Sequence, residues 1–339
     1  MQLSDRIGRR IKLQHLHVLL TVVQSGSMKK AAALLNTSQP AISRSIADLE
    51  QTIGVRLLDR DTRGIEPTEY GRAMLKHGVA AFDELKQGVK SIELLADPGA
   101  GEVRIGATTY IGEFFVSAVI ERLSRRFPRI VFHLVTADES DRLLRELSER
   151  NIDLLIGRKV DRFNDEQLSF EILYDPPLVV IASSRNPWVR RRRIALAELV
   201  NEAWVMPPPD GMLGRTYLEG FRASGLDYPR TTVFAAAPGV RLNLVATGRF
   251  LTMTTISVLK LSKRPGIKVL PVKLPYTSSP AGIITLKSRT LSPVAQLFID
   301  EARQVAKPLG RRKAGVRWMS AHGPSRRNGD VRSCVSSWR

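Results

Sequence analysis

Apolar residues recur at helical spacing in three successive stretches near the N-terminal end of the chain. The first pattern covers residues 13–24 and stops before a glycine. Ser27 is a suitable N-cap for a second helix over residues 28–35, and Thr37 or Ser38 for a third. The pattern therefore predicts a small all-α bundle in which a tight turn joins the last two helices.

The third predicted helix has two chemically different faces. The apolar positions expected in the core of the bundle are Ile42, Ile46, Leu49 and Ile53. The opposite face and the leading end carry small or hydrogen-bonding side chains, namely Gln39, Pro40, Ser43, Arg44 and Ala47. A helix N-terminus with Gln, Ser and Arg side chains can reach phosphate oxygens and base edges in the DNA major groove. The alternative is an ordinary solvated face on a three-helix bundle.

A polar hairpin is predicted directly after these helices. Residues 55–67, VRLLDRDTRGIEP, have the pattern of strand, turn and strand, with Thr62, Arg63 and Gly64 at the tip. A wing of this kind would allow Arg60 and Arg63 to contact the DNA backbone or to enter the minor groove. The hairpin therefore favours a DNA-binding unit over a solvated bundle.

The run from residue 13 to residue 71 closely resembles the DNA-binding domain of LysR-type transcriptional regulators. The matching phrases are AAALLNTSQPAISRSIADLE, GVRLLDR and PTEYG, in unbroken order. The resemblance implies a winged helix-turn-helix over residues 1–67. It places Gln39, Pro40, Ser43 and Arg44 at the contacts of the recognition helix and Arg60 and Arg63 on the wing. Lys29 and Lys30 depart from the more usual pattern, and whether they touch phosphate stays open.

A long helix with a seven-residue repeat is predicted within residues 68–98, beginning after the N-cap Thr68. The repeat places Leu75, Phe82, Val89 and Ala96 on one seam, with Gly78, Leu85 and Ile92 at its companion positions. A coiled coil between two chains would use Leu75, Phe82, Leu85, Val89 and Ile92 for dimerisation. The alternative is an amphipathic helix packed within one chain. Resemblance to the LysR type implies a homodimer or homotetramer, and the sequence does not decide between them.

Strands and helices alternate over residues 101–306. Buried strands are expected at 103–107, 131–135 and 154–156, with helices at 116–127 and 140–149 between them. A second set contains strands at 178–182, 203–206, 232–235 and 250–254 and a helix at 213–224. A strand at 281–286 and a helix at 292–305 would return the chain to the first lobe. The alternation predicts two α/β lobes with parallel sheets.

This order resembles the periplasmic-binding-protein-like effector domain of LysR-type regulators, including the phrases NIDLLIGR and LNLVATGRF. The predicted fold is therefore multidomain, with a winged helix-turn-helix, a linker helix and a two-lobed α/β domain. In such folds the ligand lies in the cleft outside the carboxyl ends of the strands. The candidate effector residues at those ends are Thr108, Thr109, Tyr110, Arg158, Pro208 and Asp210.

Each of these candidates also has a structural interpretation. Thr108 and Thr109 could hold an anion or could simply cap a helix. Arg158 could bind a carboxylate or form a surface ion pair, and Pro208 could merely stiffen a turn. Asp210 would repel an anion, which favours a sugar or another neutral polyol over an organic acid; both classes of effector stay open.

The formal charge of +19 is unevenly distributed. Residues 307–339 contribute +8 and the first 66 residues +4. We expect the basic tail from 307 to be disordered, and Arg190–Arg193 to form a solvated patch. Basic charge favours polyanion binding without conferring sequence specificity. The single cysteine, Cys334, excludes a disulfide framework and a thiolate metal site.

The leading hypothesis is a regulator that binds promoter or operator DNA and responds to a small-molecule effector. No HExxH, GxSxG, phosphate loop or GxGxxG motif is found, and the five histidines lack ligand spacing, so no catalytic residue, metal or cofactor is predicted. Without an apolar span or a secretory signal, a cytoplasmic protein with no membrane partner is expected. The alternatives are a nonspecific basic DNA-binding protein and, less favoured, a cytoplasmic solute-binding protein or an enzyme.

Overall fold

The computed structural model describes residues 7–61, 64–97, 99–158, 166–275 and 280–310. The N-terminal helices are α1 (Leu13–Ser25), α2 (Met28–Leu34) and α3 (Gln39–Ile53). The Ser27 hydroxyl caps α2 and the Ser38 hydroxyl accepts a hydrogen bond from the amide of Ala41 at 3.3 Å, as the sequence predicts. Asn36 turns the chain between α2 and α3 with a positive φ of 49°. The three helices enclose a core that includes Leu19, Ala31, Ile42, Ile46 and Leu49.

The predicted wing is an antiparallel hairpin of β1 (Leu58–Asp61) and β2 (Gly64–Pro67). The side chain of Glu50 on α3 accepts hydrogen bonds from the amides of Leu57 and Leu58, at 2.7 and 3.1 Å. This contact fixes the base of the wing to the predicted recognition helix. Thr62 and Arg63, predicted at the tip, lie outside the described residues.

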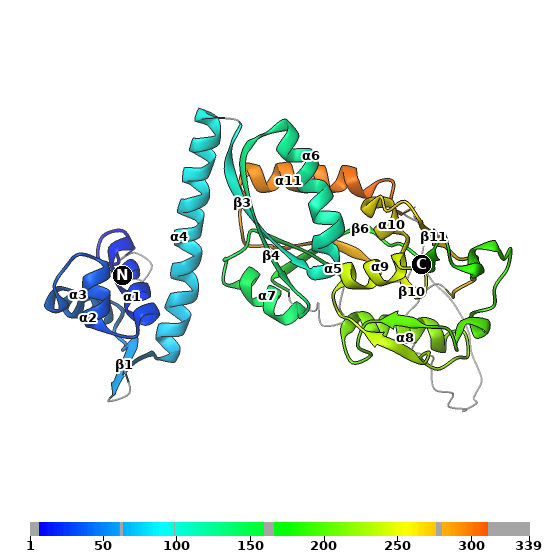
Figure 1. Ribbon diagram of the computed structural model, residues 1–339. Helices are drawn as coiled ribbons and strands as arrows, with labels where there is room; N and C mark the ends of the chain where they lie inside the picture. The colour runs from blue at the N-terminus through cyan, green and yellow to red at the C-terminus, as the bar shows by residue number, and fades with distance from the viewer. Residues whose placement is uncertain (1–6, 62–63, 98, 159–165, 276–279, 311–339) are drawn as a thin grey trace, which may run out of the picture.

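Helix α4 (Glu69–Ala96) follows the wing and stands between the N-terminal helices and the rest of the molecule (Figure 1). Thr68 caps it by accepting a hydrogen bond from the amide of Gly71 at 3.0 Å. A Cβ atom at Gly71 would lie 2.0 Å from the carbonyl oxygen of Leu57. Glycine is therefore required where α4 crosses the start of the wing.

Lobe 1 comprises residues 100–175 and 280–310 and is built on one five-stranded sheet in the order β4-β3-β5-β12-β6. Its strands are β3 (Ala100–Thr108), β4 (Arg129–Ala137), β5 (Leu154–Arg158), β6 (Leu168–Tyr174) and β12 (Ala281–Leu286). Its helices are α5 (Thr109–Ile111), which continues as a π-helical turn at Gly112–Val116, then α6 (Ser117–Arg126), α7 (Ser140–Ser148) and α11 (Pro293–Ala306).

Lobe 2 comprises residues 176–275. Its strands are β7 (Leu178–Ser183), β8 (Trp204–Met206), β9 (Thr231–Phe234), β10 (Thr252–Thr255) and β11 (Ile267–Val269). Its α-helices are α8 (Met212–Arg222), α9 (Pro238–Ala246) and α10 (Ile256–Ser262), with 3₁₀ turns at Pro187–Arg190 and Leu196–Leu199. The strands form two hydrogen-bonded groups, β10-β7-β11 and β8-β9. Trp204 and Leu251 join them in an isolated bridge.

The two-lobed α/β class is confirmed, whereas three details of the sequence prediction are wrong. The sheets are mixed, because β12 runs antiparallel to β5 and β6, and both β10 and β11 run antiparallel to β7. Strand β4 is not buried: it is an edge strand, and Val131 is half exposed. The effector domain also extends past residue 306, since Leu309 is buried in the lobe 1 core.

Candidate functional site

The outward face of α3 carries the predicted DNA-binding side chains. Gln39, Pro40 and Arg44 are exposed and Ser43 is half buried, while the apolar face of the same helix is buried. The four residues occupy the first two turns, where the positive end of the helix dipole favours a phosphate. Strand pairing places the backbone of Arg60 opposite Ile65 in the wing, and Arg63 lies outside the described residues. Lys29 and Lys30 are exposed at the start of α2.

The predicted seam of α4 is divided between two environments. Leu75 packs against the core of the N-terminal helices, and the ring of Phe82 lies 5.7 Å from that of His17 on α1. Leu85, Val89 and Ile92 continue the same face but are 50, 55 and 67% exposed. The alternative of packing within one chain is therefore correct for the first half of the seam. The second half remains free to meet another chain.

A buried cluster of charges, which sequence reasoning missed, attaches the opposite face of α4 to lobe 1; we call it the α4 clamp. The guanidinium of Arg289 donates to both carboxylate oxygens of Asp83 at 2.8 and 2.9 Å, and Arg150 donates to Asp83 at 2.6 Å. Arg289 also donates to Asp153 at 2.9 Å and to the carbonyl of Ile152 at 2.5 Å. The α4 clamp therefore joins the linker helix to the start of β5.

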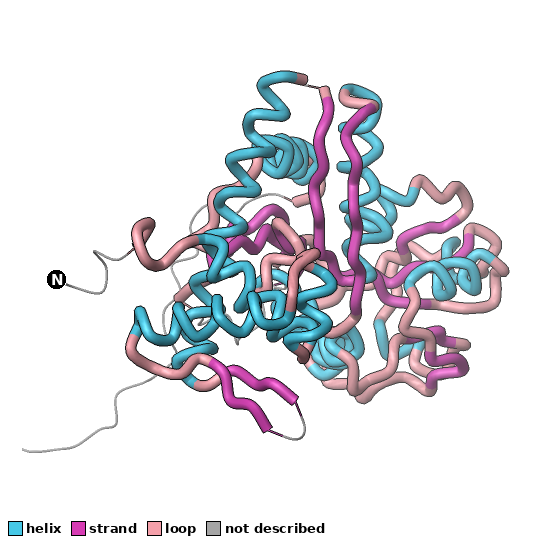
Figure 2. Tube along the Cα trace, turned by 90° about the vertical axis from the view of Figure 1, so that its left-hand side faces the viewer, coloured by secondary structure: helices cyan, strands magenta, loops and turns pink. Residues whose placement is uncertain are grey.

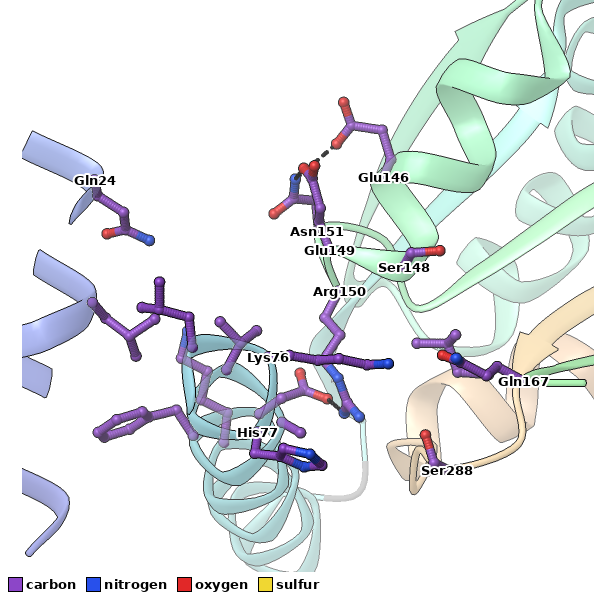
Figure 3. Close-up of a pocket in the computed structure, with 18 of the residues that line it drawn as sticks. Gln24, Lys76, His77, Glu146, Ser148, Glu149, Arg150, Asn151, Gln167 and Ser288 are labelled. Atoms are coloured by element: carbon purple, nitrogen blue, oxygen red, sulfur yellow. Dashed lines mark hydrogen bonds and ion pairs between the residues drawn. The ribbon is translucent and has the colours of Figure 1, made fainter. Parts of the chain in front are cut away.

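Figure 3 shows the surroundings of the α4 clamp. A cavity of about 1250 Å³ separates α1 and α4 from the end of α7. Lys76 and His77 line it from α4, and Glu146 and Glu149 from lobe 1. Arg150 reaches across from lobe 1 to α4. The orientation of the DNA-binding arm relative to lobe 1 is thus fixed by specific side-chain contacts.

Tyr110 connects the two lobes at the predicted effector site. Its hydroxyl lies 2.6 Å from Oγ1 of Thr254 and accepts a hydrogen bond from the amide of Thr255 at 3.0 Å. The guanidinium carbon of Arg158, at the end of β5, lies 5.9 Å from the centre of the Tyr110 ring. The structure therefore brings together two of the predicted effector residues, one from each of two strand ends.

Two further polar groups of this site come from lobe 2. Arg241 on α9 is 2% exposed, and its Nη1 donates to the carbonyls of Ala235 and Ala236 at 2.8 and 2.7 Å. The hydroxyl of Tyr217 on α8 is buried and lies near that of Tyr110, but it makes no hydrogen bond within 3.5 Å among the described residues. Burial raises the pKa of Tyr217, and Tyr110 raises it further, whereas Arg241 and Arg158 lower it. The four side chains therefore act on one another electrostatically.

Glu113 lies beside the same site, on the π-helical turn of lobe 1. Burial raises its pKa above the usual range, while Arg241 and the amide of Gly239 partly offset that effect. Gly239 and Arg241 both belong to α9 of lobe 2. A lobe 1 carboxyl group therefore faces the start of a lobe 2 helix, and this contact depends on how the two lobes sit together.

The remaining predicted effector residues are more peripheral. Thr108 is buried without a side-chain capping bond, Thr109 is half buried, Pro208 is half buried and Asp210 is exposed. The carbonyl of Asp210 accepts a hydrogen bond from Arg215.

The site is tightly closed in this structure. Tyr110, Arg241, Thr252 and Thr254 line a crevice between the lobes in which no water-sized sphere fits. An effector must therefore separate these side chains in order to enter. Among the described residues, no group of three or more His, Cys, Asp or Glu side chains is arranged to hold a metal ion, and no helix is long and apolar enough to cross a membrane.

A winged helix-turn-helix joined by a long helix to a two-lobed α/β domain defines a class of DNA-binding, ligand-sensing regulators. Residues 13–72 match the bacterial regulatory helix-turn-helix proteins of the LysR family, and residues 96–307 match the LysR substrate binding domain. The chain belongs to the LysR family of transcriptional regulators. Its role is regulatory rather than enzymatic.

Known relatives share this organisation over their full length. The transcriptional regulator GbpR of Azospirillum brasilense is 28% identical over 330 residues, covering 97% of this chain and 94% of that protein. The uncharacterised regulator YdcI of Escherichia coli is 26% identical over 307 residues, covering 90% of this chain and 99% of that protein. A full-length OxyR variant from Pseudomonas aeruginosa has a similar fold, with a TM-score of 0.61, 20% identity, and coverage of 89% and 98% of the two chains.

Proposed function

We propose that the protein is a homo-oligomeric regulator that binds an operator through α3 and the wing and responds to a small organic anion between its lobes. In this proposal residues 1–67 bind DNA, 68–98 link and dimerise, and 101–310 sense the effector. Gln39, Pro40, Ser43 and Arg44 read the major groove, and Arg60 and Arg63 contact DNA from the wing. Arg158, Arg241, Tyr110 and Tyr217 hold the effector.

The observation that carries the effector proposal is the environment of Arg241. This buried guanidinium has no carboxylate within 4 Å among the described residues. The carboxyl group of Glu113 lies near Arg241 without forming an ion pair with it, so an anion in direct contact with the guanidinium would further stabilise this buried charge. The unpartnered hydroxyl of Tyr217 would donate to the same anion. An organic acid therefore fits this site better than a neutral sugar.

The same geometry provides a mechanism of response. The hydrogen bonds of Tyr110 to Thr254 and Thr255 hold the two lobes together across the site. An anion bound to Arg241 and Arg158 would separate these groups, so it would favour a different lobe arrangement. Because lobe 1 also holds α4 through the α4 clamp, that arrangement would alter the direction of the DNA-binding arm. Regulation then requires that the effector bind the two arrangements with unequal affinity.

Replacing Arg241 by Gln is expected to abolish stabilisation of the protein by its effector. At a ligand concentration of 100 times the Kd, the intact protein should gain about 2.7 kcal/mol of stability, and the variant little of it. The measurement is thermal unfolding against a panel of small organic acids and neutral sugars. The exposed Arg222, replaced by Gln, is the matched control. Stabilisation by sugars alone would contradict the anion proposal.

Replacing Val89 and Ile92 together by Lys is expected to separate the chains. Each side chain loses about 1.5–3 kcal/mol of burial if a second chain covers it, so the dimer dissociation constant should rise by about 100-fold or more. Light scattering during size-exclusion chromatography measures the change. Glu93→Gln, on the exposed surface of the same helix, is the control. An unchanged mass for the double variant would show that dimerisation uses another surface.

A further inference from the structure

Three turns of lobe 2 and the strand β11 that follows the third turn carry five cationic residues, which we call the lobe 2 basic end: Arg185, Arg249, Lys263, Arg264 and Lys268. The amide of Ser184 donates to the carbonyl of Gly266 at 2.7 Å, which joins the first turn to the third. The guanidinium of Arg185 donates to the carbonyls of Ala246 and Thr247 at 2.9 and 3.4 Å, which joins the first turn to the second.

The same contacts hold several of these cations in place. Arg264 donates from Nη1 to Oδ1 of Asn243 at 2.6 Å, and Arg249 lies with its guanidinium carbon 5.4 Å from the centre of the Phe250 ring. These contact partners are neutral, and Arg264 interacts with the carboxyl group of Glu113 only at longer range. Within the described ranges, no carboxylate lies within 4 Å of any of the five cationic groups.

The sequence shows that this charge separation extends through the lobe. Residues 228–275 of the lobe contain eight Lys or Arg and no Asp or Glu in 48 positions. Residues 176–275 contain fifteen Lys or Arg and five Asp or Glu, a net charge of +10. In contrast, residues 99–175 and 280–310, which include lobe 1, together contain fifteen Lys or Arg and sixteen Asp or Glu, a net charge of −1. A surface that serves only solubility intersperses both signs, whereas in this lobe the five acidic residues all lie between residues 198 and 227 and none follows them.

The four-arginine run belongs to the same surface. Arg190 ends the 3₁₀ turn Pro187–Arg190 and Arg191–Arg193 follow it, and the side-chain amide of Asn186, which caps the turn, donates to the carbonyl of Gly248 at 3.1 Å. Gly248 precedes Arg249 of the lobe 2 basic end. All four arginines of the run are exposed or at the surface of the lobe. The start of the run is therefore connected to the lobe 2 basic end through Asn186, and its end leads to Ile194, which bridges to Val272.

We propose that the lobe 2 basic end binds the phosphate backbone of a duplex segment other than the one held by α3. Figure 1 places α10 and β11 of lobe 2 at the opposite side of the molecule from helices α1–α3, which face the viewer in the turned view of Figure 2, so the two surfaces can hold separate duplex segments. Duplex DNA is a uniform polyanion that is bound through released counterions without directional matching. A protein partner would instead require an apolar centre within the patch. The proposal does not depend on the identity of the effector.

The test uses the full-length chain with all five residues of the lobe 2 basic end replaced by Gln. Operator DNA is immobilised, the protein is bound to it, and capture of a second, labelled non-operator duplex is measured against salt. The intact protein should capture the second duplex, and the variant should lose at least about 10-fold of that affinity. The slope of log K against log salt should become shallower by about 0.9 for each phosphate contact removed.

The matched control removes five cations from the C-terminal tail, with Gln at Arg311, Arg312, Lys313, Arg326 and Arg327. It should retain capture of the second duplex. An unchanged operator footprint would show that the five-residue lobe 2 variant is folded. If that variant does not fold, the double variant Lys263→Gln and Lys268→Gln is used in its place. The proposal is overturned if capture persists in the lobe 2 variant, if only the tail variant loses it, or if polyglutamate of equal charge competes as well as duplex DNA.

Discussion

Replacing Arg289 by Met should lower the free energy of unfolding by about 3–5 kcal/mol, because it breaks a buried ion pair from one side. Asp83 and Asp153 both accept from this guanidinium, whose side chain is 3% exposed. The variant leaves both carboxylates in a buried site with fewer donors. Urea unfolding followed by circular dichroism measures the loss. The same change should also loosen α4 from lobe 1, which distance measurements between spin labels on the two elements would detect.

Arg303→Met is the matched control for this prediction. Arg303 makes an equally short ion pair with Glu171, at 2.7 Å, but the two side chains are 42 and 38% exposed. An exposed pair contributes about 0–1 kcal/mol, so the control should be nearly neutral. Equal losses in the two variants would contradict the importance of burial at the α4 clamp.

The pH dependence of unfolding, compared between the intact protein and Arg289→Met, offers a second measurement. Burial alone would raise the pKa of Asp83, but hydrogen bonds and charges from Arg150 and Arg289 outweigh burial and hold the pKa below 3.8. The stability contributed by the ionised carboxylate is therefore present above pH 3.8 and is lost as pH falls through the lowered pKa. Arg289→Met should reduce this acid dependence, because it removes one of the donors that lower the pKa.

The local elements of the fold could be predicted because short-range chemistry determines them. Ser27, Ser38 and Thr68 cap helices where the sequence places caps, and the apolar repeat of α3 is buried as expected. Strand order could not be predicted in the same way. β12 lies between β5 and β6 in the sheet, but the whole of lobe 2 separates it from them in the sequence. Its antiparallel direction therefore depends on contacts between distant parts of the chain.

The α4 seam shows a limit of periodicity itself. A seven-residue repeat identifies which positions share a face, but it does not identify what covers them. Phe82 and Val89 occupy the same seam, yet the first meets α1 of its own chain and the second is exposed. The two positions differ because α1 packs against α4 at Phe82 and leaves Val89 exposed, which only the packing of the folded N-terminal helices shows.

The proposed effector site could be predicted in part from the sequence. Tyr110 and Arg158 follow strands directly, and the ends of parallel strands meet at one edge of a sheet. Tyr217 and Arg241 lie within helices, where a tyrosine or arginine is ordinarily half exposed. Both are nevertheless among the buried residues of α8 and α9 in the folded lobe. The presence of an arginine in the sequence therefore could not identify Arg241 as the buried cation of the proposed effector site.

Replacing Arg44 by Ala is expected to weaken operator binding by about 5- to 150-fold, which corresponds to 1–3 kcal/mol for one base-reading side chain. Arg44 is exposed on the outward face of α3, and the neighbouring Ile42 and Ile46 hold that face away from the core. The change removes a bidentate donor without disturbing the apolar side of the helix. Footprinting and titration of the full-length protein on its own upstream DNA measure the effect.

Lys30→Ala separates base reading from charge in this experiment. Lys30 is an exposed cation on α2 of the same bundle, and loss of one phosphate contact should weaken operator and non-operator DNA alike. For Lys30→Ala, the slope of log K against log salt should become shallower by about 1. Arg44→Ala should mainly reduce the ratio between operator and non-operator affinity. If Arg44→Ala weakens both kinds of DNA by the same factor, α3 contributes charge rather than sequence recognition. Specificity would then have to come from the wing or from the deformability of the operator.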